Sequence, residues 1–141
     1  MKPMILICAA VAALVLAACG ESAQQKAEKQ VCSARSDIQK QVNELKALTP
    51  ADATANGVKD NLNTIRDDLK KVADAQPQLN DQRKEQVKKA NEKFASEFQS
   101  VVSEFGKSLA AGGARAHLQT AFQQLATAYQ SAFSKVDCSS S

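Results

Sequence analysis

The chain has 141 residues, of which 44% are hydrophobic and 23% charged, with 5 Gly, 3 Pro and no Trp. This length fits one domain, and the scarcity of glycine and proline favours helices. The formal net charge of +3 is too near zero to predict a nucleic-acid partner.

The first predicted element is an apolar segment, Met4 to Ala18, which follows the positive charge of Lys2. Its 15 residues match the apolar core of a signal peptide. They are fewer than the roughly 20 residues that a membrane-spanning helix needs. The segment ends in Leu16-Ala17-Ala18-Cys19, with a cysteine in place of the usual small-x-small cleavage site.

These four residues resemble the lipobox of bacterial lipoproteins, Leu-Ala-(Gly/Ala)-Cys. The resemblance implies that residues 1–18 are removed and that Cys19 receives a diacylglycerol thioether. It also implies that the new amine is acylated, for example with palmitate. Two or three lipid chains hold a protein stably on a membrane, whereas one chain gives marginal binding. The alternatives are an ordinary cleaved signal peptide and an uncleaved transmembrane helix.

The same resemblance predicts the location of the mature protein. We expect a lipid-anchored protein on the bacterial cell membrane or outer membrane, facing the extracytoplasmic or periplasmic space. In bacteria with two membranes, Gly20 in place of Asp favours the outer membrane.

Residues 19–30 are interpreted as a lipidated tether, because 20–30 are polar without an apolar stripe; a frayed helical extension is the alternative. From Val31 to Leu48 an apolar residue recurs every three or four positions, which predicts the first helix. Thr49-Pro50-Ala51-Asp52 predicts the end of that helix and the start of the next, with Thr49 as the cap. The turn signal Asn56-Gly57 would delay this start to about residue 57.

Three further apolar stripes predict three more helices. The second helix carries Val58, Leu62, Ile65, Leu69 and Val72 and ends at Gln76-Pro77. The third, about 81 to 110, begins after Asn80-Asp81, is terminated by Gly112-Gly113 and carries Val87, Ala90, Phe94, Phe98, Val101, Val102, Phe105 and Leu109. The fourth, about 114 to 136, carries Leu118, Phe122, Leu125, Tyr129, Ala132, Phe133 and Val136.

Four amphipathic helices with short connections predict an all-α, antiparallel up-down-up-down four-helix bundle over residues 31–138, with a tail at 139–141. Facing residues of an antiparallel pair have a constant sum of residue numbers. The stripes of the third and fourth helices obey one such sum, which pairs Phe94 with Phe133.

The cysteines also predict a closed bundle. Once Cys8 is removed and Cys19 is lipidated, Cys32 and Cys138 remain in an oxidising compartment, where a disulfide is expected. This bond would join the first and last helices. Free or intermolecular thiols are the alternative.

The sequence contains no motif that predicts catalysis, a cofactor or a metal site. His117 is the only histidine, which excludes the paired Glu-x-x-His motifs of di-iron bundles, and we expect it to flank the core. Neither Gly-x-Ser-x-Gly nor Cys-x-x-Cys-His occurs. We therefore expect a protein that is not an enzyme.

Two weaker features of the sequence, a basic run and the set of phenylalanines, each allow a structural and a functional interpretation. Near Lys70 and Lys71, the third helix has a basic run that would lie either beside anionic headgroups or on a solvated face: Arg83, Lys84, Lys88, Lys89 and Lys93. The phenylalanines predict core packing, with a hydrophobic ligand groove between the third and fourth helices as the alternative.

The segment Cys32-Ser33-Ala34-Arg35-Ser36-Asp37-Ile38 and the closing Val136-Asp137-Cys138 resemble small actinobacterial lipoproteins of unassigned role. This resemblance implies no activity. We expect a non-catalytic module that contacts an envelope protein or the cell wall. The alternatives are a carrier of a small hydrophobic molecule between the third and fourth helices, and an enzyme or enzyme inhibitor.

Overall fold

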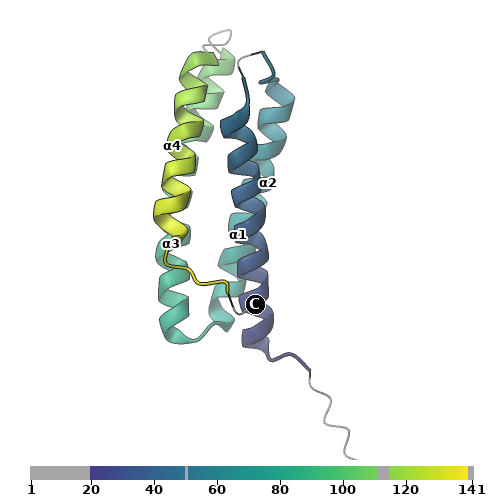
Figure 1. Cartoon of the computed structure of the whole chain (residues 1–141), viewed down its shortest axis with the longest axis vertical. Coiled ribbons are helices and arrows are strands. Elements are labelled where there is room, and N and C mark those ends of the chain that lie inside the picture. Colours follow the sequence, from purple (N-terminus) through teal and green to yellow (C-terminus); the bar gives the residue numbers. More distant parts are fainter. Residues whose placement is uncertain (1–19, 50, 111–114, 140–141) are drawn as a thin grey trace, which may run out of the picture.

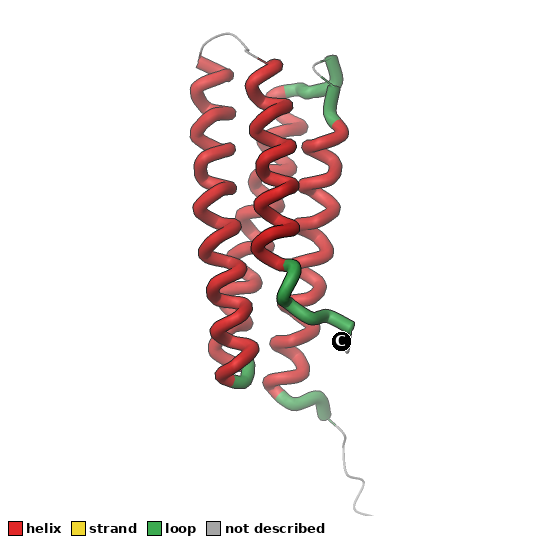
Figure 2. Tube along the Cα trace, turned by 60° about the vertical axis from the view of Figure 1, so that its left-hand side comes forward, coloured by secondary structure: helices red, strands yellow, loops and turns green. Residues whose placement is uncertain are grey.

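The computed structural model describes residues 20–49, 51–110 and 115–139. Its helices are α1 (Ala23–Ala47), α2 (Ala55–Ala75), α3 (Asp81–Ala110) and α4 (Arg115–Phe133), and a 3-10 turn, η1 (Gln76–Gln78), joins α2 to α3. The helices run alternately up and down in one elongated bundle (Figures 1 and 2), which confirms the predicted fold. One end of the bundle holds the start of α1, the α2–α3 turn and the residues that follow α4 (Figure 1).

Aliphatic and aromatic side chains from all four helices form one core. Phe94 of α3 is fully buried, and its ring packs edge-on against Tyr129 and Phe133 of α4, with centroids 5.6 and 5.8 Å away. The Phe94–Phe133 contact is the pairing that the constant sum predicted. All five phenylalanines are buried in this core: Phe94, Phe98, Phe105, Phe122 and Phe133.

Helix α1 begins at Ala23, eight residues before the apolar stripe that predicted it, so residues 23–30 form the helical extension that was the alternative to a tether. Two features explain the early start. Ser22 and Gln25 form a capping box, in which each side chain accepts a hydrogen bond from the backbone N–H of the other. Ala27 is 3% exposed and extends the buried stripe by one turn.

The cap of α2 also differs from the prediction. Thr54 caps this helix, and its hydroxyl accepts a hydrogen bond from the N–H of Gly57 at 3.1 Å. Thr49 instead closes a turn with Asp52 before the helix begins. Gly57 suits the cap, because a Cβ there would lie 2.9 Å from the Thr54 hydroxyl oxygen. Pro50 lies outside the described residues.

The second boundary of α2 and the start of α3 follow the sequence signals. α2 ends at Ala75, before Pro77, and Asn80 caps α3 by accepting a hydrogen bond from the N–H of Arg83 at 2.9 Å.

At the far end of α3 the predicted stripe was wrong by one residue. Ser108 is buried, whereas Leu109 is 53% exposed, because the inward positions Val101, Phe105 and Ser108 continue a four-three spacing. Gly112-Gly113 lies outside the described residues.

Helix α4 ends at Phe133, three residues earlier than predicted. Residues 134–139, here called the C-terminal segment, leave the helix and cross toward α1 (Figure 1). Val136 is buried and continues the core beyond the helix.

Candidate functional site: the closed end and the outer helix faces

A disulfide closes the end of the bundle where α1 begins. Cys32 and Cys138 are bonded, with an S–S distance of 2.04 Å and Cα atoms 5.6 Å apart. Cys138 lies in the C-terminal segment, so the bond joins α1 to the residues that follow α4. The other predicted site residue, Cys19, lies outside the described residues.

Two arginines hold the C-terminal segment in place beside the disulfide. The Arg35 guanidinium of α1 donates to the carbonyl oxygen of Val136 at 2.6 Å, and Arg83 of α3 donates to the carbonyl oxygen of Asp137. The Tyr129 hydroxyl donates to the carbonyl oxygen of Arg35 at 2.8 Å. Three helices therefore contribute to one closure. The sequence analysis named both arginines but did not predict that they bind the C-terminal segment, although Arg35 stands one helical turn after Cys32.

The closure shifts the pKa of two groups. Hydrogen bonds from the backbone and hydroxyl of Ser139 lower the pKa of Asp137, with smaller contributions from Arg83 and Arg35. Burial raises the pKa of the Tyr129 phenol, and Arg35 offsets part of this effect. Both shifts favour the ordinary charge states at neutral pH, with Asp137 ionised and Tyr129 neutral.

One carboxylate lies inside the bundle. Asp68 of α2 is 1% exposed, and its Oδ1 accepts a hydrogen bond from Lys71 Nζ at 2.6 Å. This bond, together with the negative charge of Asp68, raises the pKa of Lys71. Asp68 Oδ2 has no hydrogen-bond partner among the described residues. The Asp68–Lys71 pair was not predicted, because the apolar neighbours Ile65, Leu69 and Val72 dominate the pattern of α2.

The basic run of α3 has mixed surroundings. Arg83 binds Asp137, Lys89 lies 3.5 Å from Glu85, and Lys93 donates to the Ser131 hydroxyl at 2.8 Å. Acidic residues are interspersed along the same helix, as on an ordinary solvated face. Three of the five basic residues of the run thus have polar or acidic partners.

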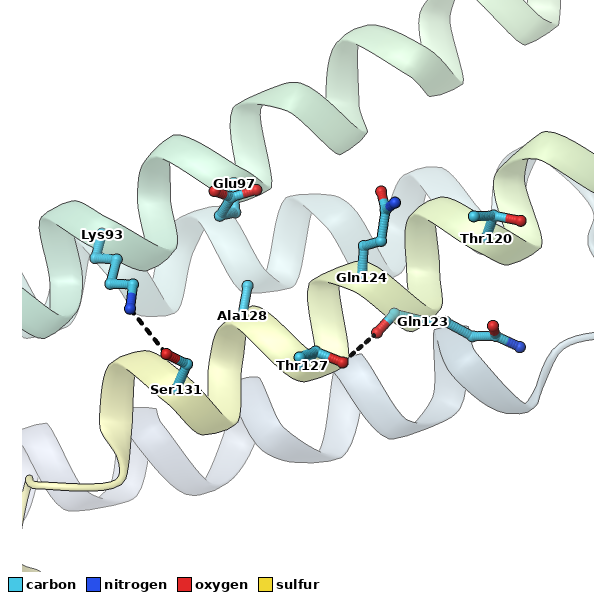
Figure 3. Close-up of a pocket in the computed structure, with 8 residues that line it drawn as sticks. All are labelled: Lys93, Glu97, Thr120, Gln123, Gln124, Thr127, Ala128 and Ser131. Carbon is cyan, nitrogen blue, oxygen red and sulfur yellow. Dashed lines mark hydrogen bonds between the residues drawn. The ribbon is translucent and has the colours of Figure 1, made fainter.

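A shallow groove of about 410 Å³ lies between α3 and α4. It is lined mainly by polar side chains (Figure 3): Lys93, Glu97, Thr120, Gln123, Gln124, Thr127, Ala128 and Ser131. None of the phenylalanines lines it. A smaller depression of about 330 Å³ lies between α2 and α3, and its lining includes the apolar side chains of Leu69, Phe98 and Val102. The groove between α3 and α4 is therefore lined by polar side chains, although most of its exposed lining comes from the apolar atoms of these side chains.

Side chains that could bind a metal ion are not grouped in the part of the chain that the structure describes. Across residues 20–49, 51–110 and 115–139, no three His, Cys, Asp or Glu side chains are grouped so that they could bind a metal. His117 is exposed at the start of α4. Among the same residues, no helix combines the length and apolar character required to cross a membrane.

Comparison with known proteins leaves the chain without a match, since no family model, no curated protein and no solved structure is similar to it.

Proposed function

We propose that this protein is a bacterial lipoprotein, anchored through Cys19, whose helical bundle acts as a non-catalytic interaction module of the cell envelope. The lipobox-like residues Leu16-Ala17-Ala18-Cys19 support the anchor. The Cys32–Cys138 disulfide supports an oxidising compartment beyond the cytoplasmic membrane.

The observation that carries the proposal is the early start of α1. Only Gly20, Glu21 and Ser22 separate Cys19 from the first helical residue, Ala23. Three residues span at most about 10 Å, so a lipid on Cys19 would hold the closed end of the bundle against the membrane. Helix α3 has 30 residues and is about 45 Å long, so the helix faces extend well beyond the headgroups.

The anchor is tested by fractionating cells that express the full chain. Cys19→Ser removes the sulfur that would carry lipid, so we expect the protein to leave the membrane fraction. Cys8→Ser is the matched control, because it changes a cysteine inside the segment that would be removed; it should leave the protein on the membrane. A Cys19→Ser protein that stays membrane-bound would overturn the anchor.

The interaction role is tested by crosslinking in the same cells. We expect one dominant crosslinked species from the intact lipoprotein. Random crosslinking proportional to abundance would contradict an interaction module. A small mass retained in native mass spectrometry would instead favour the carrier alternative, for which the depression between α2 and α3 offers the apolar side chains of Leu69, Phe98 and Val102.

A further inference from the structure

Helix α4 differs from the other helices in its outer face. From Ala116 to Ser134 the sequence contains no Asp, Glu, Lys or Arg, although 23% of the chain is charged. The exposed residues of this stretch beyond His117, here called the α4 face, carry only amide or hydroxyl groups: Gln119, Thr120, Gln123, Gln124, Thr127, Gln130, Ser131 and Ser134. A helix that faces only water usually carries charges, whereas depletion of charge marks the centre of protein interfaces.

The groove between α3 and α4 extends this neutral surface. Its two charged side chains, Lys93 and Glu97, have opposite signs and both belong to α3. The six α4 residues that line it all carry uncharged side chains (Figure 3). The surface as a whole is therefore electrically neutral and rich in groups that both donate and accept hydrogen bonds.

We propose that the α4 face pairs with the α4 face of a second copy of this chain. In a two-fold dimer the same patch lies on both sides, so residues near the axis meet their own copies. A charged residue at such a position would repel its copy. A glutamine amide or a hydroxyl can instead bond to its copy, because each group is both donor and acceptor. A different protein partner would commonly be steered and selected by opposite charge, which the α4 face does not offer.

The size of the patch sets the conditions for pairing. α4 has 19 residues and is about 28 Å long. The eight residues of the α4 face fall below the roughly 20–30 residues a side of a standard interface, so pairing is weak in dilute solution. Confinement to one membrane raises the effective concentration of the partner, and this part of the inference rests on the proposed lipid anchor.

The test places a photo-crosslinking amino acid at Gln130 in the full chain expressed in cells, with the same probe at Gln39, exposed on α1, as the control. We expect a dimer band from position 130 and none from position 39. Equal bands from both positions, no band from position 130, or a band that contains a different protein would overturn self-pairing.

A charge exchange at Thr127, near the middle of the α4 face, gives the sharper test. Thr127→Lys or Thr127→Glu alone should reduce the dimer band by about fivefold, the effect of one like-charge pair. Co-expression of the two variants should restore the band, because Lys then faces Glu, and restoration also shows that both variants fold. Single variants that leave the band unchanged, or a mixture that fails to restore it, would contradict the pairing.

Fractionation of the same cells separates this inference from the proposed function. A dimer band from chains that are not membrane-bound would contradict the proposed anchor and support the proposed pairing. Membrane-bound chains that give no dimer band would contradict the proposed pairing and support the proposed anchor.

Discussion

At the scale of single residues, the Asp68–Lys71 ion pair has partners that differ sharply in exposure. The carboxylate of Asp68 is 1% exposed, whereas the side chain of Lys71 is 55% exposed. Removing either partner therefore has different consequences. Without Asp68 the ammonium of Lys71 returns to water, but without Lys71 the carboxylate stays buried and loses its only hydrogen bond among the described residues.

We therefore predict that Lys71→Ala lowers the free energy of unfolding more than Asp68→Asn does, and that Asp68→Asn partly rescues Lys71→Ala. Urea denaturation at pH 7 measures all three variants. A larger loss in Asp68→Asn than in Lys71→Ala would contradict this account of the pair.

The same pair has a predictable pH dependence. The pKa of Lys71 is raised in the folded protein, so its contribution is fully present below the unfolded pKa of about 10.4 and is lost as pH rises through the higher folded value. The stability difference between the native protein and Lys71→Ala should thus be constant from pH 7 to 9 and shrink above pH ~10.4. Urea titrations across this range check it, and a difference that grows with pH would have the wrong sign.

Two apolar residues of α3 give a second comparison at this scale. Phe94 is fully buried against two aromatic rings, whereas Leu109 is 53% exposed. We predict that Phe94→Ala costs about 3–5 kcal/mol and that Leu109→Ala costs less than about 1 kcal/mol. Thermal and urea unfolding measure the free energy of unfolding of both variants. Similar losses would contradict the orientation of α3, with Phe94 inside the core and Leu109 outside it.

At the scale of elements, the helix starts depend on local caps. We predict that Thr54→Ala destabilises the protein by about 1 kcal/mol, because it leaves the N–H of Gly57 without its acceptor. Thr49→Ala is the matched control and should cost less than about 0.5 kcal/mol, because Thr49 only closes an exposed turn. Equal losses in urea unfolding would contradict Thr54 as the cap.

The sequence predicted an element accurately where its local signals were strong. The bounds of α3 are those predicted, since Asn80-Asp81 gave a cap and the aromatic stripe ran without a break. The helical start of α1 was only the alternative in the sequence analysis, because residues 23–30 contribute only Ala27 to the core. The Ser22-x-x-Gln25 capping box was the signal that would have identified it.

At the scale of the whole molecule, the cysteine pairing was predictable because compartment and topology agreed on one partner for Cys32. The contacts that hold the C-terminal segment were not predictable, because Arg35 and Arg83 bind backbone carbonyl groups, which every residue has. Asp68 was equally hidden, because a buried polar residue breaks the pattern by which core positions are recognised. The neutral α4 face, in contrast, was visible in the sequence as a stretch without charge.

The disulfide should dominate the stability of the closed bundle. It spans a sequence separation of 106 residues, for which chain entropy gives about 4–5 kcal/mol. We predict that reduction, or the double variant Cys32→Ser/Cys138→Ser, lowers the melting temperature and leaves the helix content at low temperature unchanged. Circular dichroism during heating measures both quantities. An unchanged melting temperature would mean that the bond does not constrain the unfolded chain.

The most direct test of the central claim is intact-mass spectrometry of the protein extracted from its own membrane, before and after reduction. We expect a chain of 123 residues that begins at Cys19, carries lipid there, and exposes Cys32 and Cys138 to alkylation only after reduction. A mass that retains residues 1–18, or a Cys19 without lipid, would contradict the claim that this bundle is held at its closed end by a membrane anchor.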